Sequence, residues 1–194
     1  MSFRMFFNAA LVGTALAAAS GAQAQEAAAD PAQEGPIVAA TYNDWEILCN
    51  QPTEGNPQVC EMYQLLKDSN DSPIAEVSIA VLPLGAEFAA GATFTTPLET
   101  FLPTGLGLRI GESEELRVEG FRVCTVVGCI VRMGLSADEV DALKAGSTAT
   151  VLIAPFVAPD RPVQITMSLS GFTRAYEDLQ TRLSEAAAAA RANQ

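Results

Sequence analysis

The sequence predicts a mainly β protein: a single antiparallel β-sandwich or barrel-like domain with one short linking helix and a C-terminal helix. Short runs rich in β-branched and aromatic residues recur along the chain, and clusters of turn-forming residues separate them. Residues 163–170 alternate strictly between apolar and polar side chains, which is typical of a strand buried on one face. Short strands separated by turns favour antiparallel pairing.

Residues 1–24 have the features of a secretory signal peptide. Arg4 precedes an apolar run over residues 5–19, and small residues follow up to Ala22 and Ala24. The apolar run is too short to span a bilayer comfortably, and signal peptidase accepts an Ala-x-Ala ending. We therefore expect cleavage after Ala24, which leaves an exported protein without an integral membrane span.

The rest of the chain divides into a lead-in and a domain. Residues 25–40 are rich in Ala, Gln, Glu and Pro without a sustained period, so we expect a flexible segment. The domain, residues 41–183, is long enough to bury its own core. Its expected strands cover residues 42–49, 59–66, 74–82, 92–95, 106–110, 116–124, 129–135, 148–156 and 163–170.

Two segments have the pattern of helices. In the first, Ser136 stands three residues before Glu139, as in a capping box, and Gly146 marks the end. The second follows residue 171, with large apolar residues spaced for one face at positions 172, 176, 179 and 183. Residues 184–194 are rich in alanine without large apolar groups, so we expect this tail to fray.

The four cysteines are Cys49, Cys60, Cys124 and Cys129. An even number in an exported chain favours disulfides, and four cysteines allow three pairings. We favour local pairing, Cys49 with Cys60 and Cys124 with Cys129, because facing residues of antiparallel strands have Cα atoms about 4.5 to 5.5 Å apart. A redox centre is disfavoured because it uses Cys-x-x-Cys at a helix start, and a Cys₄ zinc site is disfavoured because its usual Cys-x-x-Cys pairs are missing.

The loop between the last two cysteines is a candidate contact site. Thr125, Val126 and Val127 are poor turn formers, so a disulfide would hold a turn that local propensity does not. Val126 and Val127 are candidate partner-contact residues if they project as an apolar tip. The alternative is that they lie buried under the C-terminal helix, since valine is commonly an interior residue.

Composition excludes several classes of function. The formal net charge is −12 at pH 7, and the few basic residues are scattered, which argues against nucleic acids and anionic lipid surfaces. The chain has no histidine, which removes Ser-His-Asp and Cys-His catalysis. Neither Lys67 nor Lys144 lies in a Ser-x-x-Lys arrangement. A hydrolase would therefore depend on carboxylates.

Two acidic segments are candidate sites. Residues 67–73 contain Asp68, Asn70 and Asp71 but lack the glycine and the distal glutamate of an EF-hand, so a polar turn explains them better than calcium. A second group could supply a carboxylate pair for glycoside cleavage, although solvated residues at a hairpin are the simpler interpretation. This group consists of Glu112, Glu114, Glu115 and Glu119.

Several motifs, taken in order, resemble the invasion-associated locus B family of bacterial envelope proteins. They are Asp44-Trp45 before Cys49, Cys60 before Gln64, residues 102–111, Cys124 before Gly128-Cys129, and residues 168–179. The family often has Phe-Gly before Asp-Trp, where this chain has Tyr42-Asn43. The resemblance implies a small, mostly β domain in the periplasm or at the outer membrane, linked in some pathogens to host-cell invasion. It brings no catalytic residues.

Together these observations predict an exported, non-enzymatic envelope protein that binds another protein or supports the envelope. We expect a periplasmic location, with outer-membrane association or secretion as alternatives, and an envelope protein as the partner. We expect no catalytic residue, metal or cofactor. The alternative is a carboxylate-based hydrolase acting on an envelope glycan, which needs two carboxyl groups about 5 to 9.5 Å apart in a cleft.

The leader generates the first prediction. The mature protein should begin at Gln25, because the small residues before it fit signal peptidase. N-terminal sequencing of the exported protein measures this directly. An intact Met1 in protein isolated from the cell envelope would contradict it.

Overall fold

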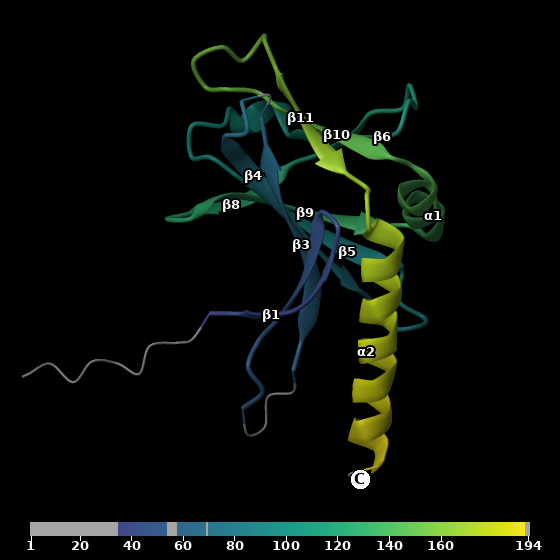
Figure 1. Cartoon of the computed structure of the whole chain (residues 1–194). Helices are drawn as coiled ribbons and strands as arrows, with labels where there is room; N and C mark the ends of the chain where they lie inside the picture. The colour runs from purple at the N-terminus through teal and green to yellow at the C-terminus, as the bar shows by residue number, and fades with distance from the viewer. Residues whose placement is uncertain (1–34, 54–57, 69, 193–194) are drawn as a thin grey trace, which may run out of the picture. The chain divides into compact units, whose positions relative to one another are not determined.

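The computed structural model describes residues 35–53, 58–68 and 70–192, which form two antiparallel sheets and two α-helices (Figure 1). The expected signal peptide, residues 1–24, lies outside the described residues. The seven-stranded sheet has the order β1 (Ile37–Tyr42), β2 (Trp45–Cys49), β3 (Cys60–Lys67), β4 (Pro73–Val81), β5 (Ala90–Thr96), β9 (Gly128–Leu135) and β8 (Phe121–Thr125). The four-stranded sheet has the order β11 (Val163–Ser168), β10 (Thr148–Ile153), β6 (Leu106–Ile110) and β7 (Arg117–Glu119).

The core lies between the seven-stranded sheet and a second layer. Alternate residues of β2 to β5 and β9 point inward and are buried. The four-stranded sheet covers one part of this face, with β11 against β3 and β7 against β9, and α2 (Phe172–Ala192) covers the part formed by β1 to β4. Two separate sheets packed in this way confirm the sandwich and not the barrel-like alternative.

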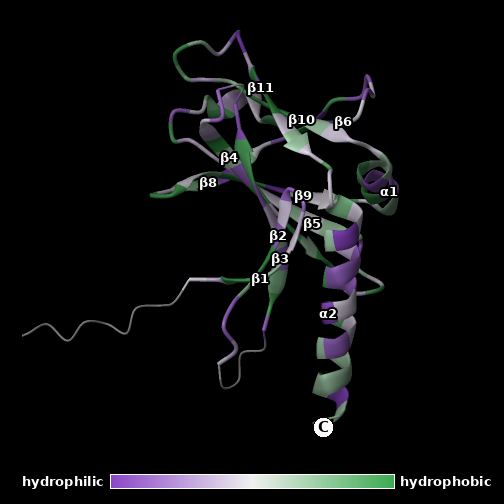
Figure 2. Cartoon of the chain, viewed as in Figure 1, coloured by the Kyte–Doolittle hydropathy of each residue, from purple (hydrophilic) through white to green (hydrophobic). Residues whose placement is uncertain are grey.

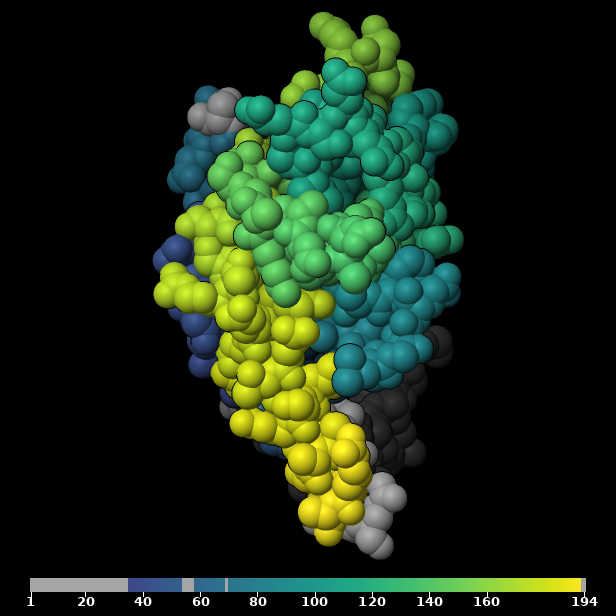
Figure 3. All heavy atoms as spheres, turned by 90° about the vertical axis from the view of Figure 1, so that its right-hand side faces the viewer, coloured from purple at the N-terminus to yellow at the C-terminus, as the bar shows by residue number. Residues whose placement is uncertain are grey.

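Helix α2 is anchored by its first half. The ring of Phe172 meets Trp45 of β2 edge to face, with centroids 5.4 Å apart, and Ala175, Tyr176 and Leu179 are also buried. Figure 3 shows α2, in yellow, beside the green α1 (Ala137–Ala145), where the ammonium group of Lys144 lies 4.5 Å from the Tyr176 ring centre. The helix continues to Ala192, and the fraying expected for the alanine-rich tail from residue 184 stays a prediction.

Strand β1 was missed in the sequence. Residues up to 40 were expected to be a flexible lead-in and residues 42–49 one strand, but β1 already begins at Ile37 and pairs with β2. The chain reverses at Asn43, whose φ is 53°. Asparagine tolerates this left-handed conformation better than most residues, so it makes a tight turn where the pattern suggested a continuous strand.

A second difference occurs at Gly120. Residues 116–124 were expected to form one strand, but the chain forms β7 in the four-stranded sheet and then β8 in the seven-stranded sheet. Only Gly120 separates them. The hydropathy pattern continues across this crossing, so it gave no sign that the two halves belong to different sheets.

Gln64 of β3 joins the two sheets. Its side chain is only 7% exposed, and its amide nitrogen donates to the carbonyl oxygens of Ser168 at 3.0 Å and Asp44 at 3.2 Å. The Ser168 backbone N–H donates back to Gln64 Oε1 at 2.9 Å, and the indole of Trp45 donates to the Ser168 carbonyl at 2.9 Å. Because a buried amide is costly unless it is paired, these bonds fix β11 over β3.

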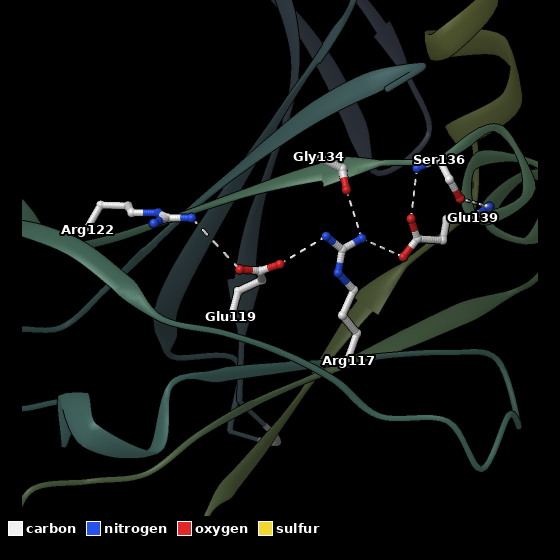
Figure 4. A network of polar contacts seen from close by, with 6 residues as sticks. All are labelled: Arg117, Glu119, Arg122, Gly134, Ser136 and Glu139. Carbon is white, nitrogen blue, oxygen red and sulfur yellow. Dashed lines mark hydrogen bonds and ion pairs between the residues drawn. The ribbon is translucent and has the colours of Figure 1, made fainter. Parts of the chain in front are cut away.

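Arg117 makes a second connection between the sheets (Figure 4). From β7 its guanidinium donates to the Gly134 carbonyl of β9 at 2.8 Å and to Glu139 of α1 at 2.6 Å, and it pairs with Glu119 at 3.0 Å. Glu139 also accepts from the Ser136 backbone, while Ser136 Oγ accepts from the Glu139 N–H, which confirms the capping box. Burial acts to raise the pKa of Glu139, but the hydrogen bonds from Ser136 and Arg117 outweigh it and hold the pKa below its usual value.

The sheet connection predicts the effect of Gln64→Leu. This change removes one acceptor and two donated hydrogen bonds and leaves the Ser168 N–H without its partner, so the free energy of unfolding should fall by about 2 to 4 kcal/mol. Urea denaturation of the oxidised protein measures it. The matched control is Gln164→Leu on the exposed side of β11, which should change stability by less than about 0.5 kcal/mol. Equal effects of the two changes would show that Gln64 does not hold the sheets.

The capping box predicts a smaller effect. Ser136→Ala should lower the free energy of unfolding by about 0.5 to 2 kcal/mol, because the Glu139 N–H loses its acceptor at the start of α1. Ser147→Ala, at an exposed position just after the same helix, is the control. An unchanged denaturation midpoint for Ser136→Ala would refute the cap's contribution.

Candidate interaction surface

All four cysteines are paired in the structure. Cys49 faces Cys60 across β2 and β3 with Cα atoms 4.1 Å apart, and Cys124 faces Cys129 across β8 and β9 at 4.0 Å. These are the two local pairings that the sequence favours. No thiol remains free for redox chemistry or metal binding. Both disulfides therefore act as structural links between neighbouring strands.

The second disulfide closes a projecting apolar hairpin. Val126 is 96% exposed and Val127 is 74% exposed, so neither lies under α2. The end of β8 stands clear of the sheet and is coloured as hydrophobic (Figures 1 and 2). Gly128 has a φ of 145°, and a Cβ there would lie 2.5 Å from the Thr96 carbonyl oxygen, so the turn requires glycine.

The outer face of the seven-stranded sheet is hollowed beside this hairpin. A groove of about 430 Å³ is lined by Val127, Leu65, Glu76 and Thr95 among others, and a second of about 340 Å³ shares Glu76 and Thr95 and adds Tyr63. A third hollow of about 560 Å³ includes both Tyr63 and Leu65 and extends past the edge of the sheet to Thr166 and Ser168 of β11. Because they share these residues, the three hollows form one continuous surface, which we call the concave face.

Tyr63 lines two of the three hollows of the concave face. It pairs directly across the strands with Glu46 of β2 and Ser78 of β4, and its hydroxyl donates to Glu76 at 3.0 Å. Glu61 stands two residues before it on the same strand and therefore on the same side. The sequence interpretation missed this cluster, although the alternation in β3 could have placed Glu61, Tyr63 and Leu65 on one face.

The glutamates proposed for glycan cleavage do not form a catalytic pair. Glu112, Glu114 and Glu115 lie exposed on the turn after β6, and Glu119 is ion-paired with Arg117. A hollow of about 240 Å³ contains Glu115 and Glu139. However, Arg117 and Ser136 lower the pKa of Glu139, whereas a general acid needs a raised pKa. The hydrolase alternative is not supported.

The candidate calcium loop is a turn held by its own residues. Asp68 accepts from the backbone N–H groups of Ser72 and Asn70, which lower the pKa of its carboxyl group. Lys67 forms an ion pair with Asp71 at 3.0 Å. Within residues 35–53, 58–68 and 70–192, no group of three or more Cys, Asp or Glu side chains is arranged to hold a metal ion.

Comparisons with known proteins agree on one family. The family model described as invasion associated locus B (IalB) protein matches residues 45–180. An invasion protein B homolog of Brucella abortus is 28% identical over 147 residues, covering 72% of this chain and 78% of the relative. Invasion protein B of Bartonella bacilliformis is 23% identical over 188 residues, covering 91% of this chain and 97% of the relative.

A solved structure shares the fold. The crystal structure of invasion associated protein B from Bartonella henselae matches with a TM-score of 0.65 and 24% identity, covering 75% of this chain and 97% of that chain. The two sheets, the paired cysteines and the matched segment from Trp45 onward agree with the resemblance first noted in the sequence. The chain belongs to the invasion associated locus B family.

Proposed function

We propose that this chain is an exported, non-enzymatic envelope protein that acts by binding another protein through the disulfide-closed hairpin. The observation that carries the proposal is the exposure of Val126 and Val127 at a turn held by the Cys124–Cys129 bond. A contact whose conformation is already fixed loses little entropy when a partner binds. The groove beside Val127, which also includes Leu65 and Pro97, would extend the apolar contact.

The proposed location is the periplasm, with outer-membrane association or secretion as alternatives. Two disulfides support an oxidising compartment, and the relatives bear names that refer to invasion. Among the described residues, no helix is long and apolar enough to cross a membrane. The proposed partner is an envelope protein, and support of the envelope through that contact is the proposed role.

The hairpin generates a direct test. The double variant Val126→Ser with Val127→Ser should reduce in-cell crosslinking to envelope partners, because it removes the apolar tip while keeping the disulfide. Its stability should change by less than about 0.5 kcal/mol, since both side chains are exposed.

The control is Val157→Ser, which removes an equally exposed valine from the loop between β10 and β11. It should leave crosslinking unchanged. The proposal fails if the double variant crosslinks like the original protein, or if both variants lose crosslinks to the same extent.

A further inference from the structure

The concave face carries a local excess of negative charge. Glu46 lies directly opposite Tyr63 in the next strand, where Cβ atoms are about 4.5 to 5.5 Å apart, and Glu61 stands two positions along the same strand. Glu76, on the other side, accepts the hydrogen bond from the Tyr63 hydroxyl. Three carboxylates from three adjacent strands therefore surround one aromatic ring.

These charges have few cations near them. In the described part of the chain, neither Glu46 nor Glu61 takes part in an ion pair, and Lys67 on the same strand already pairs with Asp71. Arg132 lies on the same row of facing residues but three strands away, beyond Ser78 and Thr93. The carboxylates around Tyr63 are thus not neutralised within the fold.

The surroundings of Tyr63 raise the pKa of its hydroxyl group. Burial raises its pKa to about 12, and the hydrogen bond to Glu76 and the charges of Glu76 and Glu46 act in the same direction. A phenol is neutral near pH 7 with or without this shift, so the hydroxyl keeps its hydrogen bond to Glu76 and the ring presents a flat aromatic surface beside that carboxylate. A lysine or arginine side chain could lie over such a ring and reach the carboxylates beside it.

Apolar side chains border the charged centre. Leu48 lines the hollow that contains Glu61, and Leu65 lines the other two hollows. The methylene stems of lysine and arginine pack well against such residues while their charged ends remain at carboxylates. The concave face thus offers apolar contacts for the methylene stem of a lysine or arginine and carboxylates for its charged end.

We propose that the concave face binds a segment of a protein partner that carries lysine or arginine side chains, with Glu46, Glu61 and Glu76 as the anionic contacts and the Tyr63 ring between them. The inference rests on the proposed function, that this chain binds a protein, but its three anionic contacts and the Tyr63 ring lie outside the valine tip. A second copy of the chain is a poor occupant, because the net charge of −12 would place like charges in contact. Nucleic acids and anionic lipids are excluded by the same sign of charge.

The test uses the oxidised mature protein and a labelled peptide of alternating lysine and glycine as the probe, with binding measured by fluorescence anisotropy. In the face variant, Glu46, Glu61 and Glu76 are each changed to Gln. Binding should weaken by about tenfold, because three partly exposed charge pairs of modest strength are lost. In the turn variant, Glu112, Glu114 and Glu115 are each changed to Gln, which alters the net charge equally. Its binding should weaken by less than about twofold.

Equal weakening by the face and turn variants would overturn the inference, because the peptide would then respond only to total charge. An unchanged affinity in the face variant would overturn it as well. Thermal unfolding of each variant checks the fold, and Tyr63→Leu, which removes the ring and leaves the carboxylates, should weaken binding in a protein of unchanged net charge.

The two proposals can fail separately. Val126→Ser with Val127→Ser keeps the three carboxylates and Tyr63, so it should change the affinity for the lysine–glycine peptide by less than about twofold while it reduces crosslinks to envelope partners. If the peptide does not distinguish the face variant but the valine variant still loses crosslinks, the concave face loses its role and the proposed function stands. If the valine variant still crosslinks to envelope partners and the face variant binds the peptide more weakly, the concave face keeps its role and the proposed contact at the hairpin is wrong.

Discussion

The structure depends on the attachment of β11 to β3 through Gln64. A buried amide in the middle of a strand is costly unless each of its polar atoms is paired, and here Ser168 and Asp44 supply those partners. Trp45 adds a further hydrogen bond to the Ser168 carbonyl. The position of β11 in turn fixes α2, which starts just after Gly171. That glycine has a φ of 91°, and a Cβ there would overlap the Tyr42 carbonyl oxygen. One polar connection thus places the helix on the core.

Strand β3 contributes one set of side chains to the core and the other set to the proposed binding surface. Because side chains of a strand alternate between faces, β3 directs Met62, Gln64 and Leu66 into the core and leaves Tyr63 and Leu65 on the outside. The four-stranded sheet and α2 occupy the inner face, so the binding surface that we propose is on the outer one. Away from Gln64, the hydrogen bonds of Arg117 connect β7 to β9 and to α1. Changes on the outer face should therefore leave this framework intact.

Local chemistry made much of the fold predictable. Residues close in sequence are enough to predict three features. These are the capping box at Ser136, the strand in residues 163–170 and the two disulfides between neighbouring strands. The sequence predictions were wrong or incomplete where contacts between residues far apart in the chain determine the structure. Gly120 separates strands of different sheets, and the outer cluster around Tyr63 depends on the register of β2, β3 and β4. The exposure of the valine tip likewise depends on where α2 packs, which the local sequence does not contain.

We propose that the outer face of the seven-stranded sheet binds a partner and that the two packed layers hold this face in place. Site-specific photocrosslinking in cells tests it most directly, with benzoylphenylalanine placed at Leu65 on the concave face or at Thr181 on the exposed side of α2. We expect adducts from position 65 that map by mass spectrometry to lysine- or arginine-bearing segments of an envelope protein, and none from position 181. Adducts from position 181 without any from position 65 would contradict it.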